Sequence, residues 1–110
     1  MDSSLLHQDL AIAKEVQRAC IPQTPPVIRG LNCATFYKPA YILGGDYYDF
    51  LALPDGGWAV AIGEVSGKGI GAALVMASIQ GALRAQVLRG GSDIEAQIVN
   101  ANRLVWECSP

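Results

Sequence analysis

The sequence is poor in charge for its length. Of 110 residues, eight are Lys or Arg and ten are Asp or Glu, so charged residues make up 16% of the chain against 51% hydrophobic residues. Disordered chains combine low hydrophobicity with high net charge, and this composition excludes that class. The formal net charge is -2. A chain without a basic excess is not expected to bind nucleic acid or an anionic membrane surface.

Cysteine and histidine are also scarce. The spacings of the three cysteines, Cys20, Cys33 and Cys108, fit no zinc or redox motif. We therefore expect small, buried, free thiols in a reducing compartment. The one histidine, His7, has no serine or cysteine nucleophile motif near it, which argues against triad chemistry.

Targeting signals and long apolar runs are absent from the sequence. The N-terminal segment MDSSLLHQDL has neither a basic start nor an uninterrupted apolar stretch, so no signal peptide is predicted. No run approaches the length of about 18 apolar residues that a membrane-spanning helix needs. The cytoplasm is the expected location.

The hydrophobic pattern predicts an α+β fold. A Pro-Asp-Gly-Gly turn at 54–57 separates two apolar runs and therefore predicts a hairpin. The segment at 70–88 is apolar nearly all round, which indicates a helix buried on more than one side. The predicted order is helix, three antiparallel strands, two helices: residues 3–20, 31–37, 45–53, 58–65, 70–88 and 93–107.

Local signals mark the ends of the helices. Ser3 or Ser4 is a candidate N-cap for the first helix, and Pro22 requires the helix to end before it. Ser92 or Asp93 is a candidate cap for the last helix.

Two acidic residues stand at the edges of the predicted hairpin. Asp46 follows Gly44 and Gly45, and Glu64 lies at the end of the next strand. Counting outward from the turn, antiparallel pairing brings these two carboxylates within a few ångströms of each other. Close carboxylates repel unless a proton or cation lies between them, and such oxygen ligands suit Mg²⁺ or Mn²⁺. The alternative is that both are ordinary turn residues.

The glycine-rich turn after the third strand allows a different interpretation. The segment GKGIGA at 67–72 fits the dinucleotide fingerprint G-x-G-x-x-G/A, follows a predicted strand and opens a helix. Asp93 stands about 20 residues further on, where a ribose-binding acid would be sought. Against a dinucleotide site, the strand belongs to a hairpin rather than a βαβ unit, and Asp93 has the character of a helix cap.

Several blocks of the sequence together resemble one known family. The blocks AKEVQRACIPQTPP, FYKPAYILGGDYYDF and AVAIGEVSGKGIGAALVMA look like the opening half of a bacterial PPM-type (PP2C-like) serine/threonine phosphatase. The subgroup is that of the stage II sporulation phosphatase and the stress-response phosphatases that regulate sigma factors. The resemblance begins near Ala13 and implies a β-sandwich flanked by helices. It also implies hydrolysis of phosphoserine or phosphothreonine with two Mn²⁺ or Mg²⁺ ions.

The resemblance assigns roles to particular residues. Asp46 matches a metal-binding aspartate, and Glu64 stands where the family has an aspartate that bridges the two metals. Val65 would offer its backbone carbonyl to the metal, and Asp49 would support the strand or contact a metal ligand rather than bind metal directly. Glu64 is a departure, because its extra methylene moves the carboxylate and Mg²⁺ tolerates little geometric error.

The resemblance also implies an incomplete enzyme and a set of partners. Residues 1–25 resemble a linker helix that transmits a signal from an upstream sensor or receiver domain. Residues 26–110 resemble the N-terminal half of a phosphatase domain, whose remaining metal aspartates would follow Pro110. The implied substrate is a phosphorylated protein such as an anti-sigma-factor antagonist. The alternative is a non-catalytic phosphatase-like module for binding or dimerisation, and the apolar stripe of the first helix fits either a homodimer or packing within the chain.

Overall fold

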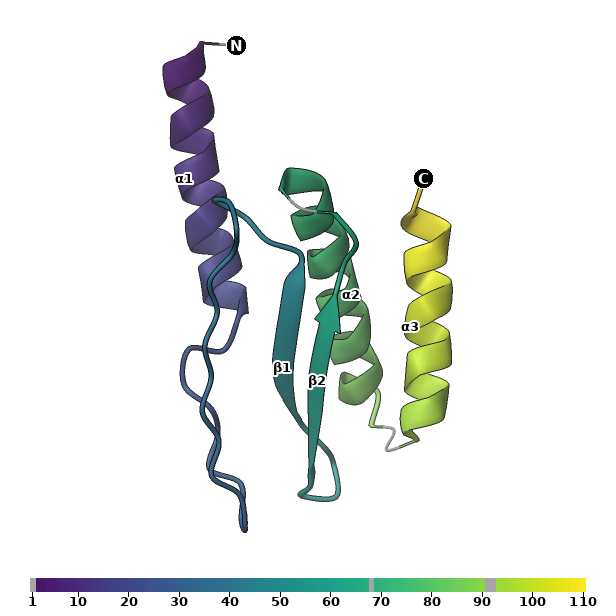
Figure 1. Ribbon diagram of the computed structural model, residues 1–110. Helices are drawn as coiled ribbons and strands as arrows, with labels where there is room; N and C mark the ends of the chain where they lie inside the picture. The colour runs from purple at the N-terminus through teal and green to yellow at the C-terminus, as the bar shows by residue number, and fades with distance from the viewer. Residues whose placement is uncertain (1, 68, 91–92) are drawn as a thin grey trace.

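The computed structural model describes residues 2–67, 69–90 and 93–110. Within these ranges the chain forms three helices and one two-stranded antiparallel sheet, which confirms the α+β class. Figure 1 shows α1 and α3 on opposite sides of a central unit made of the hairpin and α2. The elements are α1 (Ser3–Cys20), β1 (Asp46–Ala52), β2 (Trp58–Glu64), α2 (Ile70–Leu88) and α3 (Ile94–Cys108).

The predicted hairpin forms through the Pro-Asp-Gly-Gly turn. The Leu53 amide donates to the Gly57 carbonyl at 2.9 Å, and the Gly56 amide donates to the Leu53 carbonyl at 3.1 Å. Gly56 has a φ of 87°, in the left-handed region that glycine adopts without the clash of a side chain. The resulting register pairs Tyr48 with Ile62 across the strands. Because side chains alternate along each strand, every second residue lies on the same face of the hairpin.

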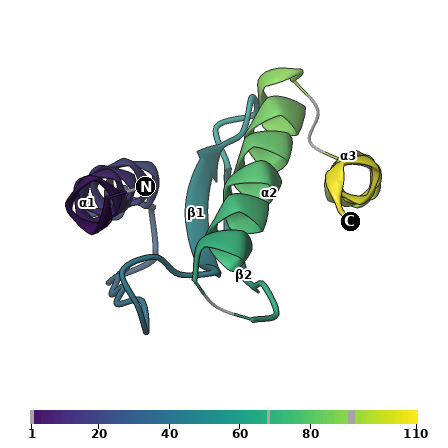
Figure 2. The same ribbon diagram turned by 90° about the horizontal axis from the view of Figure 1, so that it is seen from above.

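The helix α2 covers one face of the hairpin and completes the core. Tyr47 from β1 and Met76 from α2 are buried together with Ile21, which follows α1 directly. Asp49 and Leu51 are buried on the same face of β1 as Tyr47. Figure 2 shows α2 along one side of the strands, with α1 beyond β1 on the other side. The core therefore joins the hairpin, α2 and the end of α1.

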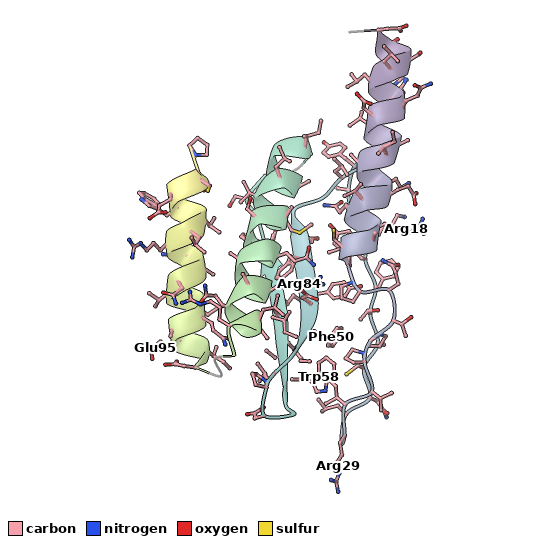
Figure 3. All side chains as sticks on the ribbon, turned by 180° about the vertical axis from the view of Figure 1, so that it is seen from behind. Arg18, Arg29, Phe50, Trp58, Arg84 and Glu95 are labelled. Carbon is pink, nitrogen blue, oxygen red and sulfur yellow. The ribbon has the colours of Figure 1, made fainter. Side chains whose placement is uncertain are left out.

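The other face of the hairpin is covered only in part: Tyr48 and Phe50 on β1 are half-buried, and β2 is open. Val60 and Ile62 on β2 are 61% and 89% exposed. Figure 3 shows Phe50 and Trp58 on this side of the hairpin, away from α2. The two faces of the same two strands therefore differ sharply in burial.

The strand predicted at 31–37 does not form. Within the described chain this segment makes no backbone ladder with another strand. Its side chains do alternate, because Cys33, Thr35 and Tyr37 are more buried than their neighbours. The segment packs through side chains instead, and the Tyr37 and Tyr48 rings meet edge to face with centroids 6.2 Å apart. Since a strand needs a hydrogen-bonded partner as well as alternation, the sheet has two strands rather than three.

The helix α1 has the predicted range, but its cap and its packing differ from the prediction. Asp2, not Ser3 or Ser4, is the N-cap, and its carboxylate accepts a hydrogen bond from the Ser4 amide at 2.9 Å. No residue of α1 is buried. Ile12 on the apolar stripe, for example, is 62% exposed. The helix is anchored just past its C-terminal end, where Ile21 is 1% exposed.

The helix α3 packs along α2. The Asn100 side-chain amide donates to the Gln86 side-chain oxygen at 3.1 Å. Asp93 is the N-cap of α3 and accepts from the Ala96 amide at 3.1 Å, whereas the alternative cap, Ser92, lies outside the described residues. Among the described helices, α2 has a length and apolar composition that would also suit a bilayer span. Core helices share that property, and α2 packs against both β1 and α3.

The cysteines are free but not buried as predicted. Cys20 and Cys108 are exposed, and Cys33 is half-buried. Cys20 and Cys108 are the last residues of α1 and α3. Their positions at the helix ends leave both thiols exposed to solvent.

Candidate metal-binding site

Asp46 and Glu64 lie directly opposite each other where the hairpin is open. The strand register pairs them, as the sequence predicts. Their positions place both side chains on the hairpin face away from α2. Opposed residues on one face have Cβ atoms about 5 Å apart. Both residues are exposed, so water screens the repulsion between the two carboxylates.

The carboxylate pair opens into a hollow between the hairpin and the segment that precedes it. This hollow has a volume of about 600 Å³, and Phe36, Tyr37 and Lys38 line it together with both carboxylates. Lys38 brings a positive charge to a site that otherwise carries two negative ones. The hollow is large enough to admit hydrated ions or a phosphate group.

Gly45 brings the backbone before β1 against α2 and the end of β2. A Cβ atom on Gly45 would lie 2.9 Å from the Ala72 Cβ and 3.2 Å from the Val65 carbonyl oxygen, so a side chain there would push the strand away. The Val65 amide donates to the Gly45 carbonyl at 3.0 Å. The carbonyl of Val65, a predicted ligand, therefore lies beside the residue that precedes Asp46.

The Tyr37 hydroxyl is the buried side-chain polar atom without a hydrogen-bond partner in the part of the chain that the structure describes. Burial raises the pKa of Tyr37, and the negative charge of Asp46 raises it further. The hydroxyl therefore keeps its proton at neutral pH. A buried donor near a carboxylate, with no partner of its own, fits a site that holds a further oxygen group.

The residues present fit a hard divalent cation in kind, although they are few. Asp46, Glu64 and the Val65 carbonyl are all oxygen donors, the ligands that Mg²⁺ and Mn²⁺ prefer. Within the described residues no group of three or more His, Cys, Asp or Glu side chains could hold a metal ion. Mg²⁺ is commonly bound through one or two carboxylates and completes its shell with water and substrate phosphate. Two carboxylates and a carbonyl are therefore a partial metal site.

Asp49 lies on the opposite face of β1, and its side chain is fully buried. Arg84 on α2 donates to it twice, from Nε to Oδ2 at 2.7 Å and from Nη2 to Oδ1 at 3.0 Å. The Phe50 amide donates to Oδ1 at 3.0 Å. The Tyr47 hydroxyl and the Gln80 amide each lie 3.5 Å from Oδ2. Asp49 therefore binds the hairpin to α2, which is the supporting role predicted for it.

The contact between Asp49 and Arg84 affects the pKa values of Arg84 and Tyr47. The hydrogen bond to Asp49 raises the pKa of Arg84, and burial acts in the opposite direction. Burial and the charge of Asp49 raise the pKa of Tyr47, whereas the charge of Arg84 lowers it. Figure 3 shows Arg84 extending from α2 toward the strands. Arg84 is therefore a cation and Tyr47 a neutral donor at physiological pH.

Arg84, Gln80 and Gln17 are functional side chains that the motif blocks do not reveal. Arg84 and Gln80 bind Asp49, and the Gln17 amide binds the backbone of Gly44. A signal for the first two exists, because they stand four residues apart on one face of a mostly apolar helix. A buried aspartate on the facing strand requires such partners. Gln17 carries no comparable signal in the sequence.

The structure does not provide the setting of a dinucleotide fingerprint. β2 pairs antiparallel with β1 and starts no βαβ unit. Asp93 is occupied as the cap of α3. Lys68, in the middle of the GKGIGA segment, lies outside the described residues.

Comparisons with known proteins agree with this geometry. A two-stranded hairpin followed by a glycine turn and an apolar helix is compatible with part of a PP2C-like phosphatase fold. The family model of Stage II sporulation protein E matches residues 54–109, just over half of the chain. The chain therefore belongs to the Stage II sporulation protein E family. Glu64 and Val65 lie within the matched residues, and Asp46 precedes them.

A curated relative gives the same result on a longer segment. Protein IcfG of Synechocystis sp. (strain ATCC 27184 / PCC 6803 / Kazusa) is 32% identical to this chain over 76 residues. The match covers 69% of this chain and 12% of that protein. The chain thus spans about an eighth of the length of this relative.

Proposed function

We propose that this chain is part of a metal-dependent protein serine/threonine phosphatase in which Asp46, Glu64 and the Val65 carbonyl bind Mn²⁺ or Mg²⁺. The observation that carries the proposal is the pairing of Asp46 with Glu64 across the open face of the hairpin. Family membership supports the phosphatase and signalling assignment.

Each residue of the candidate site would have a separate role, which depends on where it lies. Asp46 and Glu64, which line the hollow, would hold the cation, and the Val65 carbonyl, which lies beside Gly45, would be a further ligand. Lys38, an exposed residue that lines the same hollow, would supply a positive charge to a substrate phosphate group. When bound, the metal lowers the pKa of a water molecule so that it can attack phosphorus. The remaining ligands come from water, from substrate or from other parts of the protein.

The proposed partners follow from the same family. The substrate would be a phosphorylated protein such as an anti-sigma-factor antagonist, and the site would act in the cytoplasm. Residues 1–25 would link an upstream sensor or receiver domain to the phosphatase part at 26–110. The exposed apolar stripe of α1, with Ile12 at 62% exposure, is available for a homodimer.

A non-catalytic module for partner binding is the second candidate. Two points favour it: the resemblance leads us to expect an aspartate where Glu64 stands, and the described residues hold no metal cluster of three side chains. This candidate predicts that the chain binds a protein partner without binding Mn²⁺.

Hydrolysis of p-nitrophenyl phosphate with Mn²⁺ separates the two candidates. The assay uses this chain and the longest chain encoded in the same reading frame. Asp46→Asn removes a charged ligand, so we expect turnover to fall at least about 100-fold. Asp9→Asn is the control, because Asp9 is an exposed residue of α1 and lines none of the hollow. If the wild type is inert at both lengths and calorimetry shows no Mn²⁺ binding, the phosphatase proposal is wrong and the binding module is favoured.

A further inference from the structure

Gln17 connects α1 to the loop that carries Asp46. Its side-chain Nε2 donates to the Gly44 carbonyl at 2.8 Å, and the Gly44 amide donates to its Oε1 at 3.1 Å. One amide group thus satisfies both backbone polar groups of one residue, 27 positions away in the chain. This is the pairing that a neighbouring β-strand would otherwise provide.

Gly44 has little room to move away from this contact. A Cβ atom at Gly44 would lie 2.9 Å from the Pro39 Cβ and 3.1 Å from the Tyr37 hydroxyl oxygen. Gly44 is itself buried, so loss of the Gln17 amide would leave its N–H and C=O without partners. Gln17 and the segment at 37–39 therefore hold Gly44 from two sides.

Only Gly45 separates Gly44 from Asp46, so the position of Gly44 affects that of Asp46. Gly45 follows, and it is packed against the Ala72 Cβ and bonded through its carbonyl to the Val65 amide at 3.0 Å. Asp46 comes next and pairs with Glu64. A shift of Gly44 would change the separation of Asp46 from Glu64 and from the Val65 carbonyl. Metal sites depend on partners behind the ligands that fix where the ligands stand.

The end of α1 is fixed independently of Gln17. The Gln80 amide on α2 donates to the Cys20 carbonyl at 2.6 Å, and the Tyr48 hydroxyl donates to the Pro22 carbonyl at 2.9 Å. These bonds hold the end of the helix against α2 and β1. Gln17, nearly one turn earlier, contacts the loop before Asp46 rather than the core.

We propose that Gln17 is a positioning residue for the candidate metal site: its amide sets the place of Asp46 relative to Glu64 by holding Gly44. This inference rests on the proposed function, because a positioning role matters only if Asp46 binds a cation. It adds a residue on α1 to a site whose ligands lie on the hairpin.

The test replaces Gln17 with methionine, which keeps the length and helix propensity but removes both hydrogen bonds. Gln8→Met is the matched control, because Gln8 is an exposed glutamine on the same helix. The first readout is amide hydrogen exchange in this chain without metal. We expect the Gly44 amide to exchange at least about tenfold faster in Gln17→Met, the effect of losing one such hydrogen bond. We expect faster exchange also at the Val65 amide, which donates to the Gly45 carbonyl, and no change at either amide in Gln8→Met.

The second readout is Mn²⁺ affinity, measured by calorimetry in the longest chain of the same reading frame. We expect Gln17→Met to weaken Mn²⁺ binding about tenfold, the usual result of removing a partner behind a ligand, with Gln8→Met unchanged. Unchanged exchange at Gly44 and Val65, or unchanged Mn²⁺ affinity despite faster exchange, overturns the proposal. If the wild type binds no Mn²⁺, the proposed function fails, and the exchange data still decide whether Gln17 holds Gly44 in place.

Discussion

The two faces of the hairpin hold carboxylates in opposite settings. Asp49 faces α2, has a fully buried side chain and is bound twice by Arg84. Asp46, three residues earlier on the same strand, faces away from α2 and has another acid, Glu64, across from it. An odd separation along a strand puts two side chains on opposite faces. The motif GGDYYD therefore contains one aspartate that stabilises the fold and one that is free to bind a ligand.

The difference shows how one hairpin can carry an exposed pair of acids beside a buried ion pair. The buried face supplies a cation for its single carboxylate, because an unpaired buried charge is costly. The open face leaves two carboxylates to water, where repulsion between them is weak. Burial and hydrogen-bond partners, rather than residue type, separate the structural acid from the candidate ligand.

The largest expected effect comes from breaking the buried pair. Arg84→Met leaves the Asp49 carboxylate, with 0% side-chain exposure, without its cation. We expect the free energy of unfolding to fall by about 3 kcal/mol, as when one partner of a buried ion pair is removed. Chemical denaturation followed by circular dichroism measures this change.

Two variants serve as controls for the loss of stability in Arg84→Met. Arg103→Met breaks an exposed pair with Glu107 on α3, and Asp46→Asn alters the open face. Each should change the unfolding free energy by less than about 0.5 kcal/mol. If Asp46→Asn costs as much as Arg84→Met, Asp46 is a structural residue and the contrast between the faces is wrong.

A smaller effect is expected from restoring the family residue on the open face. Glu64→Asp shortens the side chain by one methylene, and Mg²⁺ and Mn²⁺ sites are sensitive to ligand position. We expect Mn²⁺ affinity to rise about tenfold in calorimetric titration. Glu107→Asp, an exposed glutamate on α3, is the control. A weaker affinity in Glu64→Asp would show that the rest of the site is adapted to glutamate.

The smallest effect concerns pH on the buried face. Burial and the charge of Asp49 raise the pKa of Tyr47 above its ordinary value near 10. The folded state therefore binds a proton that the unfolded state releases at alkaline pH. Its contribution to stability is complete below pH 10 and declines as the pH rises toward the folded pKa. Tyr47→Phe should flatten this decline, with a change of less than about 1 kcal/mol at pH 7.

Denaturation of the wild type and Tyr47→Phe at pH 8 and pH 11 gives the comparison. Tyr41→Phe is the control on an exposed tyrosine. An equal loss of stability at pH 11 in both variants and the wild type would assign the alkaline transition to other groups.

The hairpin and the paired acids could be predicted from sequence, because local signals determine them. The Pro-Asp-Gly-Gly turn fixes the register, and the register alone places Asp46 opposite Glu64. The strand at 31–37 was predicted wrongly for the converse reason. Its alternation is real, but strand formation depends on a partner that sequence periodicity does not report.

The side chains that position the site were harder to predict. Gln17 acts on Gly44 across 27 residues, and Gln80 acts on the Cys20 carbonyl across 60. Such bonds depend on how α1 and α2 meet the hairpin, which is set by packing around Ile21 and Met76. Propensity and motif spacing describe each segment separately and contain no information on these contacts.

The anchoring of α1 has a mechanical consequence. The helix is held at Cys20 and Ile21 and extends beyond the other elements toward Ser3 (Figure 1). At 1.5 Å per residue, Ser3 lies about 26 Å from Cys20 along the helix, and Gln17 lies about 4.5 Å from it. If the helix rotates rigidly about Cys20, the displacement at Gln17 is about one sixth of that at Ser3. A movement of about 6 Å at Ser3 then becomes about 1 Å at Gln17. A movement at the tip of α1 would thereby reach Gly44, which Gln17 binds, as a displacement about six times smaller.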